Sequence, residues 1–327
     1  MAELKAKNYI DGVLSGDRRI LAKTITLVES RHPDHQLLAR QILDGLLDRT
    51  GRAIRLGITG VPGVGKSTFI ESLGMLLVEN GDRVAVLAVD PSSSRSRGSI
   101  LADKTRMERL AVADGAFIRP SPSRGTLGGV ARMTRETMLI CEAAGFDVII
   151  VETVGVGQSE TAVSSMVDFF LVLMLAGAGD ELQGIKKGVL ELADAVAINK
   201  ADGDNIEKAR KARRQYEMAL QLLHPASPSW APPVLTCSAV TMEGIQVIWE
   251  TVLAHRLQLS KTGELADKRR HQALHWMWAI LEEGLKERFQ RHPRIIQRLP
   301  VLCHQVEQGT LAPTVAAQEL LFLLDKE

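Results

Sequence analysis

Residues 60–67 read Gly60-Val61-Pro62-Gly63-Val64-Gly65-Lys66-Ser67. This stretch matches the phosphate-binding loop pattern G-x-x-x-x-G-K-[ST] at every defined position. A mostly apolar run at residues 54–58 precedes it, and a helical pattern over residues 67–78 follows it. An ordinary Gly-rich turn would not need a lysine and a hydroxyl side by side at its end. The strand–loop–helix context therefore predicts an α/β domain of the P-loop NTPase class.

The residue types in this loop suit phosphate binding. Backbone N–H groups in a Gly-rich turn point inward toward phosphate oxygens, and the helix that follows adds the positive end of its dipole. Lys66 would place its charge on the β- and γ-phosphates, and the Ser67 hydroxyl would bind Mg²⁺. We expect nucleotide contacts along the whole segment from Gly60 to Thr68.

The composition indicates a globular protein. The chain has 327 residues, 45% of them hydrophobic and 24% charged, and a formal net charge of +1. This length suits about two domains, or one large domain with appendages, and the near-neutral balance predicts no nucleic-acid or membrane partner. The three cysteines are far apart, and the first residues contain no apolar segment typical of a secretory signal. We therefore expect a soluble, cytoplasmic protein in a reducing compartment.

Apolar periodicity divides the chain into three predicted regions. Residues 1–50 form a helical extension, with Asp17 and Asp34 as expected N-caps. Residues 51–260 alternate apolar runs with helical segments, which is typical of a mostly parallel sheet covered on both faces. Residues 261–327 are predicted to be helical and carry no catalytic pattern. The expected strands are residues 54–59, 84–89, 148–152, 169–175, 195–199 and 234–237.

A second motif, Asn199-Lys200-Ala201-Asp202, lies at the end of one expected strand. The Asp202 carboxylate can accept hydrogen bonds from both N1–H and the exocyclic amine of guanine. Adenine offers an acceptor at that ring nitrogen and no amine beside it, and a buried acceptor left unpaired is costly. Asn199 would brace the phosphate loop and the O6/N7 edge of the base, while the Lys200 stem would lie along the ring plane. The motif predicts a guanine-specific pocket.

The tripeptide Ser238-Ala239-Val240 follows the last expected strand. Ligand loops gather at the carboxyl ends of parallel strands, so this segment would supply a backbone N–H to guanine O6. Ser-Ala is a frequent dipeptide, and the prediction rests on its position alone.

Carboxylates at two other expected strand ends are candidates for holding Mg²⁺. Glu152 ends one strand run, where an acidic residue holds Mg²⁺ directly or through water, although a solvated strand-end carboxylate is the alternative. Gly155, three residues later, would donate its N–H to the γ-phosphate. Asp90 ends another run and would orient Mg²⁺ or the attacking water, unless it forms an Asx turn before Pro91.

Two further candidates lie in polar or Gly-rich segments. Asp103, within residues 98–107, is a third carboxylate of this kind or the N-cap of a helix. Lys186, within residues 177–188, would reach phosphate or a partner, or belong to a solvated connection.

Together these segments resemble the MeaB/ArgK family of GTPases, which are chaperones of methylmalonyl-CoA mutase and related cobalamin-dependent mutases. The resemblance extends over nearly the whole chain. It implies a GTPase that works as a homodimer through a C-terminal helical arm, residues 261–327. It also implies that Asp90, Asp103 and Glu152 are metal and switch carboxylates, and that Lys186 belongs to a third switch. The segments that carry it are residues 60–68, 89–93, 98–107, 151–160 (V-E-T-V-G-V-G-Q-S-E), 177–188 and 199–202.

The resemblance further implies that this protein protects the mutase and that GTP acts as its switch. Family members gate cofactor loading and help to replace damaged cobalamin. Residues 94–97, S-R-S-R, are more basic than expected for the first switch, which leaves the contacts of that switch open.

From these residues we expect a Mg²⁺-dependent GTPase in which water attacks the γ-phosphate in line. Lys66, Mg²⁺ and the loop amides would stabilise the transferred charge. No built-in arginine finger is evident, so turnover should be slow and stimulated by a partner.

Alternatives remain open at this point. A kinase would need an acceptor pocket, and no sequence feature indicates one. A metal-delivery GTPase would need a His-rich or Cys-containing tract, whereas His271 and His275 have helical spacing without a third ligand. A non-enzymatic scaffold would use the nucleotide only to set its shape.

Overall fold

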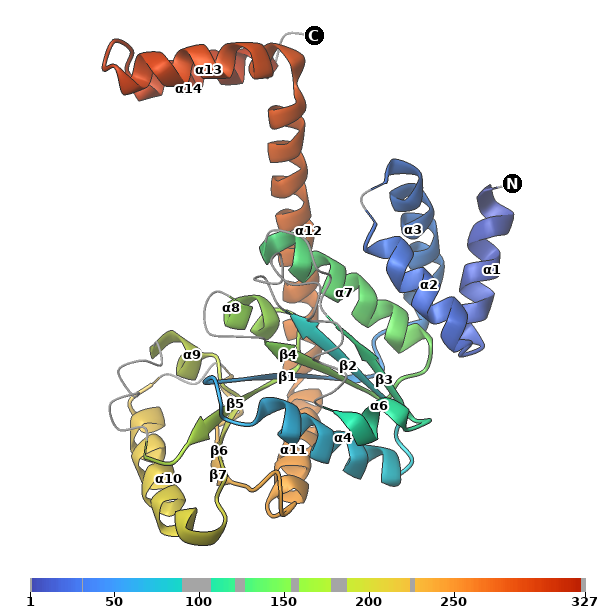
Figure 1. The fold of residues 1–327 in the computed structure, drawn as a ribbon, viewed down its shortest axis with the longest axis vertical. Coiled ribbons are helices and arrows are strands. Elements are labelled where there is room, and N and C mark those ends of the chain that lie inside the picture. Colours follow the sequence, from blue (N-terminus) through green and yellow to red (C-terminus); the bar gives the residue numbers. More distant parts are fainter. Residues whose placement is uncertain are drawn as a thin grey trace. The chain divides into compact units, whose positions relative to one another are not determined.

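The computed structural model describes residues 2–30, 32–89, 107–120, 127–153, 159–177, 187–223 and 227–324. The chain divides into two compact units, Met1–Gln272 and Ala273–Glu327. The strands of the first unit are β1 (Ile54–Gly60), β2 (Val84–Val89), β3 (Ala116–Arg119), β4 (Val148–Thr153), β5 (Phe169–Leu175), β6 (Ala195–Asn199) and β7 (Val234–Thr236). They form a seven-stranded parallel sheet in the order β3-β2-β4-β1-β5-β6-β7 (Figure 1).

Helices connect these strands, as parallel pairing requires. The helices of the first unit are α1 (Ala2–Leu14), α2 (Arg18–Val28), α3 (Pro33–Leu46), α4 (Lys66–Glu79), α6 (Glu108–Val112), α7 (Leu127–Ala143), α8 (Ser159–Ser164), α9 (Lys187–Glu191), α10 (Ile206–Gln221) and α11 (Ile245–Thr262), of which α4 to α10 lie between strands. Short 3-10 turns occupy Leu47–Arg49 and Gly203–Asn205. Helix α12 (Glu264–Arg291) begins in the first unit, and α13 (Pro293–Glu307) and α14 (Pro313–Leu324) complete the second.

The sheet is buried on both faces, which explains its almost uninterrupted apolar strands. Alternate residues point to opposite faces. On one face, Leu56, Ile58 and their neighbours pack against α4, α6 and α11. On the other, Ile149, Val151 and their neighbours pack against α7 and α10, and the N-terminal helices α1–α3 pack in turn on α7 (Figure 1). The predicted α/β fold with a parallel sheet is confirmed.

All the expected strands are present, with ends that differ by one residue at β1, β4 and β7. The sequence did not predict β3, because it is a short edge strand in which only Ala116 is fully buried. Within the described sheet it pairs with β2 alone. Across from that pairing, the Arg18 guanidinium at the start of α2 donates to the carbonyl oxygens of Asp114, at 2.7 Å, and Ala116.

The two expected N-caps had different outcomes. Asp17 caps α2, since its carboxylate accepts hydrogen bonds from the backbone N–H groups of Arg19 and Ile20. The expectation for Asp34 was wrong, because Pro33 takes the first helical position of α3 and His32 becomes the N-cap. Proline suits that position, since its fixed φ is helical and its missing N–H is not needed there.

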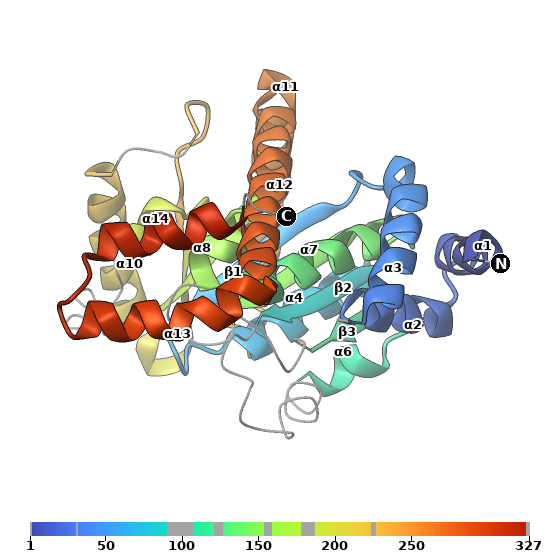
Figure 2. The same ribbon diagram turned by 90° about the horizontal axis from the view of Figure 1, so that it is seen from above.

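The second unit has a small core of its own. Helices α13 and α14 run side by side (Figure 2), with Ile295, Leu302, Ala316 and Leu320 buried between them. An ion pair between Arg298 and Glu319, at 2.6 Å, joins the same two helices. Throughout the described part of the chain, no helix combines the length and apolarity needed to cross a bilayer.

Candidate nucleotide site

The phosphate loop connects β1 to α4 and has two positions that only glycine can occupy. A Cβ atom on Gly60 would lie 2.5 Å from the carbonyl oxygen of Leu173 in β5. Gly65 has a φ of +91°, in the left-handed region that favours glycine. A Cβ atom there would also lie 3.1 Å from the side-chain nitrogen of Asn199. The loop therefore passes close to both β5 and the residues that follow β6.

Lys66 begins α4 and folds back over the loop. Its Nζ atom donates to the carbonyl oxygen of Gly60 at 2.9 Å, with Val61 O at 3.5 Å. Among the described residues, no side chain makes a capping hydrogen bond at the start of α4. Because the first N–H groups of a helix lack partners within it, this end of α4 can accept an anion.

Ser67 and Glu152 bring two oxygen atoms together beside the loop. Glu152 lies at the end of β4, opposite Ile58 of β1 in the sheet register, and is only 6% exposed. Its Oε1 atom is 3.4 Å from the Ser67 hydroxyl. The adjoining strand ends are tied by a buried hydrogen bond from Thr153 to Thr59, at 2.7 Å. Such hard oxygen donors suit Mg²⁺, which needs few protein ligands because phosphates and water supply the rest.

A larger metal cluster is not found among the residues that the structure describes. No group of three or more His, Cys, Asp or Glu side chains within those ranges is arranged to hold an ion.

Asn199 ends β6 and contacts the phosphate loop, as its position predicts. Its amide nitrogen donates to the carbonyl oxygen of Val64 at 2.8 Å. Its amide oxygen accepts the Ala239 N–H at 3.1 Å, with the Cys237 thiol at 3.6 Å. Burial raises the pKa of that thiol to about 12, so it stays protonated. Asn199 thus joins the loop after β1 to the loop after β7.

Lys200 follows in a left-handed conformation, with φ at 58°. Its Nζ atom donates to the carbonyl oxygen of Gly63 at 2.8 Å, and its own carbonyl accepts the Asn205 side chain at 2.9 Å. The lysine stem therefore lies between the phosphate loop and the Asn199–Asp202 motif.

Asp202 and Ser238 form the remaining polar pair of the site. The Ser238 hydroxyl donates to the Asp202 carboxylate and accepts the Thr241 N–H at 3.1 Å. In the segment 238–241, every backbone N–H except that of Val240 has an acceptor among the described residues. Val240 is also 79% exposed.

Several predicted site residues lie outside the described residues. They are Asp90, Asp103, Gly155 and Lys186. The structure brings together the remaining ones, from residues 60–68, Glu152, residues 199–202 and residues 238–240, at the carboxyl ends of the strands.

Sequence reasoning missed one buried contact of this site. Ser72, in the middle of α4, donates its hydroxyl to the carbonyl oxygen of Ala239 at 2.6 Å. A serine within a helical pattern carries no motif signal, so only the three-dimensional structure could find it.

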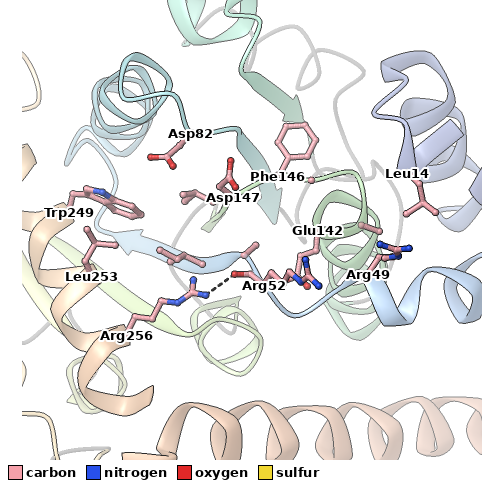
Figure 3. Close-up of a pocket in the computed structure, with 15 residues that line it drawn as sticks. Leu14, Arg49, Arg52, Asp82, Glu142, Phe146, Asp147, Trp249, Leu253 and Arg256 are labelled. Carbon is pink, nitrogen blue, oxygen red and sulfur yellow. Dashed lines mark hydrogen bonds between the residues drawn. The ribbon is translucent and has the colours of Figure 1, made fainter. Parts of the chain in front are cut away.

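A cavity of the first unit lies elsewhere. A space of about 740 Å³ opens at the amino ends of β1 and β4, the opposite edge of the sheet from the phosphate loop (Figure 3). Asp82, Asp147, Trp249 and Arg256 point into it, and Arg256 donates to the carbonyl oxygen of Arg52 at 2.7 Å. None of the predicted nucleotide-site residues lines it.

Comparison with known proteins identifies the family. The model of a family described as methylmalonyl-CoA mutase-associated GTPase MeaB matches residues 21–294. The chain belongs to the MeaB family. GTPase ArgK of Escherichia coli K12 is 50% identical over 311 residues, which is 93% of this chain and 92% of that one. A mouse protein named methylmalonic aciduria type A homolog, mitochondrial, is 46% identical over 97% of this chain and 80% of its own length.

A solved structure supports the same fold. The crystal structure of a protein described as LAO/AO transport system kinase has a TM-score of 0.80 and 42% sequence identity, with 99% of this chain and 98% of that chain covered. The protein is therefore a GTPase that binds guanine nucleotides on an α/β P-loop fold.

Proposed function

We propose that this GTPase is a nucleotide-switched chaperone of a cobalamin-dependent acyl-CoA mutase, with methylmalonyl-CoA mutase as the partner. In this role it protects the mutase and gates loading of its cofactor in the cytoplasm. The description of the matching family as mutase-associated and the name of the mouse relative support the choice of partner. The hydrogen bond from Asn199 to Val64 carries the switching part of the proposal. Through it, one side chain would connect the loop that holds the phosphates with the residues that hold the base.

The residues of the site divide the work of binding GTP. The backbone of residues 60–68 and the N-terminus of α4 would hold the phosphates. Lys66 would exchange its contact with Gly60 for the β- and γ-phosphates. Asp202, already oriented by Ser238, would accept the N1–H and amine of guanine. The backbone N–H groups of Ala239 and Val240 would face O6, and that of Ala239 would be shared with Asn199.

Ser67 and Glu152 fit a divalent cation, because their oxygens already lie side by side. Together with Asp90 they would hold Mg²⁺, which would neutralise charge on the phosphates during hydrolysis. We place Asp103, Gly155 and Lys186 in the switch segments that respond to the γ-phosphate. Without an arginine supplied in cis, intrinsic hydrolysis would be slow and faster with the partner bound.

We also propose that two copies of the chain associate. In this arrangement, residues 1–50 are an extension of a GTPase domain at 51–260, and residues 261–327 form the dimerisation arm. The second unit exposes large apolar side chains, each 46–56% exposed, which a second copy would cover. They include Leu274, Met277, Trp278, Leu281, Leu285 and Phe322.

Calorimetry with the purified mutase tests the function directly. The full-length protein is titrated into methylmalonyl-CoA mutase with GDP and with a non-hydrolysable GTP analogue. We expect binding whose affinity differs by about tenfold or more between the two nucleotides, as typical coupling between sites allows. No binding, or equal affinity in both states, would refute the switch.

A kinase is the second candidate, because the solved relative is described as a transport system kinase. With γ-labelled GTP, a GTPase releases the label as free phosphate, whereas a kinase transfers it to an acceptor. Label found on an acceptor would overturn the proposal.

A further inference from the structure

The hydroxyl of Ser72 reaches out of its own helix. A serine inside a helix commonly donates to a carbonyl oxygen one turn earlier or points to solvent. Ser72 is buried, with 9% of its surface exposed, and donates instead to Ala239 O at 2.6 Å. Ala239 is 167 residues away in the chain, in the loop after β7.

Both backbone polar groups of Ala239 form hydrogen bonds to side chains. Its N–H donates to Asn199 at 3.1 Å while its C=O accepts from Ser72. Its methyl group is buried in the same apolar cluster as Phe69 and Leu73 of α4. The position of this loop is therefore set from β6 and from α4 together.

These contacts close a ring between the two ends of the site. Asn199 donates to Val64 in the phosphate loop, and the helix that leaves this loop carries Ser72 back to Ala239. The ring runs from Val64 to Asn199, then to Ala239, then to Ser72, and returns along α4. Three hydrogen bonds, at 2.8, 3.1 and 2.6 Å, make the connections between elements.

We propose that Ser72 is a positioning residue for guanine recognition. It holds the 238–240 loop against α4, in the position where the backbone N–H groups of the loop would donate to guanine O6. Ser72 acts through Ala239 and does not touch the base. This inference rests on the proposed guanine site. Removal of the hydroxyl leaves the Ala239 carbonyl buried without its donor, and such a group is costly enough to move the loop toward water.

The test compares two nucleotides that differ only at the position the loop would read. Steady-state KM and kcat are measured on the full-length Ser72→Ala protein with GTP and with 6-thio-GTP. The sulfur analogue keeps the N1–H and the amine that face Asp202 but replaces O6 with a weaker acceptor. We expect KM for GTP to rise roughly tenfold, which is the ratio that the loss of one good hydrogen bond produces. KM for 6-thio-GTP and both kcat values should stay nearly unchanged.

Other variants separate this idea from a general loss of packing. Thr134→Val removes another buried hydroxyl, one that donates within α7 at 2.9 Å, and should leave both KM values at the wild-type level. If Ser72→Ala is too unstable to purify, Ser72→Cys keeps a weak donor and should shift KM in the same direction by less. Equal rises for both nucleotides, or no rise for either, would overturn the inference.

The Asp202→Asn variant, assayed in parallel, tells which idea has failed. If Asp202→Asn loses its preference for GTP over XTP while Ser72→Ala keeps the wild-type ratio of KM between GTP and 6-thio-GTP, only the role of Ser72 is wrong. If Asp202→Asn keeps the preference, the proposed guanine site itself is wrong.

Discussion

Arg269 grips the buried carboxylate of Asp168 with two parallel hydrogen bonds, 2.8 Å to Oδ1 and 2.6 Å to Oδ2. Asp168 precedes β5 and is 2% exposed, whereas Arg269 lies in the first turns of α12. Arg269 also donates to the carbonyl oxygen of Ala53 at 2.8 Å. Neighbouring α12 side chains hold the same segment, with Lys268 donating to Asp168 O at 2.6 Å and Gln272 to Val167 O at 2.8 Å. The start of α12 is therefore fixed to the amino ends of the central strands.

Replacement of Arg269 should destabilise the first unit strongly. In Arg269→Met the Asp168 carboxylate stays buried without its cation, which costs about 3–5 kcal/mol in comparable pairs. Urea unfolding followed by tryptophan fluorescence measures the difference. Arg270→Met is the matched control, because the Arg270 side chain is 70% exposed and its partner Asp267 is exposed too. Equal losses in the two variants would contradict this assignment.

The same ion pair predicts sensitivity to acid. Burial alone would raise the pKa of Asp168, but the hydrogen bonds and charge of Arg269, with the charge of Arg55, hold it below its ordinary value of 3.8. A group with a depressed pKa stabilises the fold above its unfolded value, and this contribution is lost as the pH falls through the folded value. The wild type should therefore lose stability below about pH 4, the ordinary range of an aspartate. Asp168→Asn should be less stable at pH 7 and change less over that acid range.

Asp202 should set the choice of base. An asparagine at this position presents a donor to the amine of guanine, which is itself a donor, so affinity for GDP should fall about a hundredfold or more. Xanthine carries a carbonyl in place of that amine, and XDP should bind Asp202→Asn better than GDP. Calorimetry with both nucleotides measures the switch. Asp204→Asn, an exposed change two residues away, should bind GDP better than XDP, as the wild type does.

Glu152 should control the demand for magnesium. Glu152→Gln keeps the shape of the side chain and removes the charge beside Ser67. We expect the Mg²⁺ concentration for half-maximal GTP hydrolysis to rise about 10- to 100-fold, the range for ligands that orient a metal site. Glu250→Gln, an exposed change on α11, should not alter it. If Glu152→Gln needs the same Mg²⁺ concentration as the wild type for half-maximal GTP hydrolysis, Glu152 does not belong to the metal site.

The apolar side chains of the second unit should set the oligomeric state. Leu281→Asp places a charge among these apolar side chains. Leu281 is 46% exposed, so the aspartate can be accommodated within one protomer. In sedimentation experiments the wild type should be dimeric and the variant monomeric, with unchanged GDP affinity. A dimer that survives this substitution would place the contact elsewhere.

The sequence was sufficient to predict most of the sheet, because its strands are buried on both faces and leave continuous apolar runs. It failed at β3, where only one of four residues is fully buried and no run stands out. At the cap of α3 it favoured Asp34 over the preceding residues, although Pro33 fixes where the helix begins. These errors arise at edges and ends, where local geometry outweighs periodicity.

Contacts within the candidate site were predictable where a motif fixes the spacing. The approach of Asn199 to the phosphate loop follows from two motifs at the carboxyl ends of β1 and β6. The contact of Ser72 with Ala239 does not, since it depends on how deeply the 238–240 loop sits against α4. The roles of these residues toward nucleotide stay predictions until the variants above are measured.

The Arg18 contacts beside β3 bear on whether the folded protein aggregates. An edge strand offers unpaired carbonyl groups to any extended segment of another molecule. Arg18 occupies one of these acceptors, on Ala116, and a second just before the strand, on Asp114. It therefore places a positive charge beside the start of this edge. Arg18, at the start of α2, thus protects this edge of the sheet against edge-to-edge aggregation.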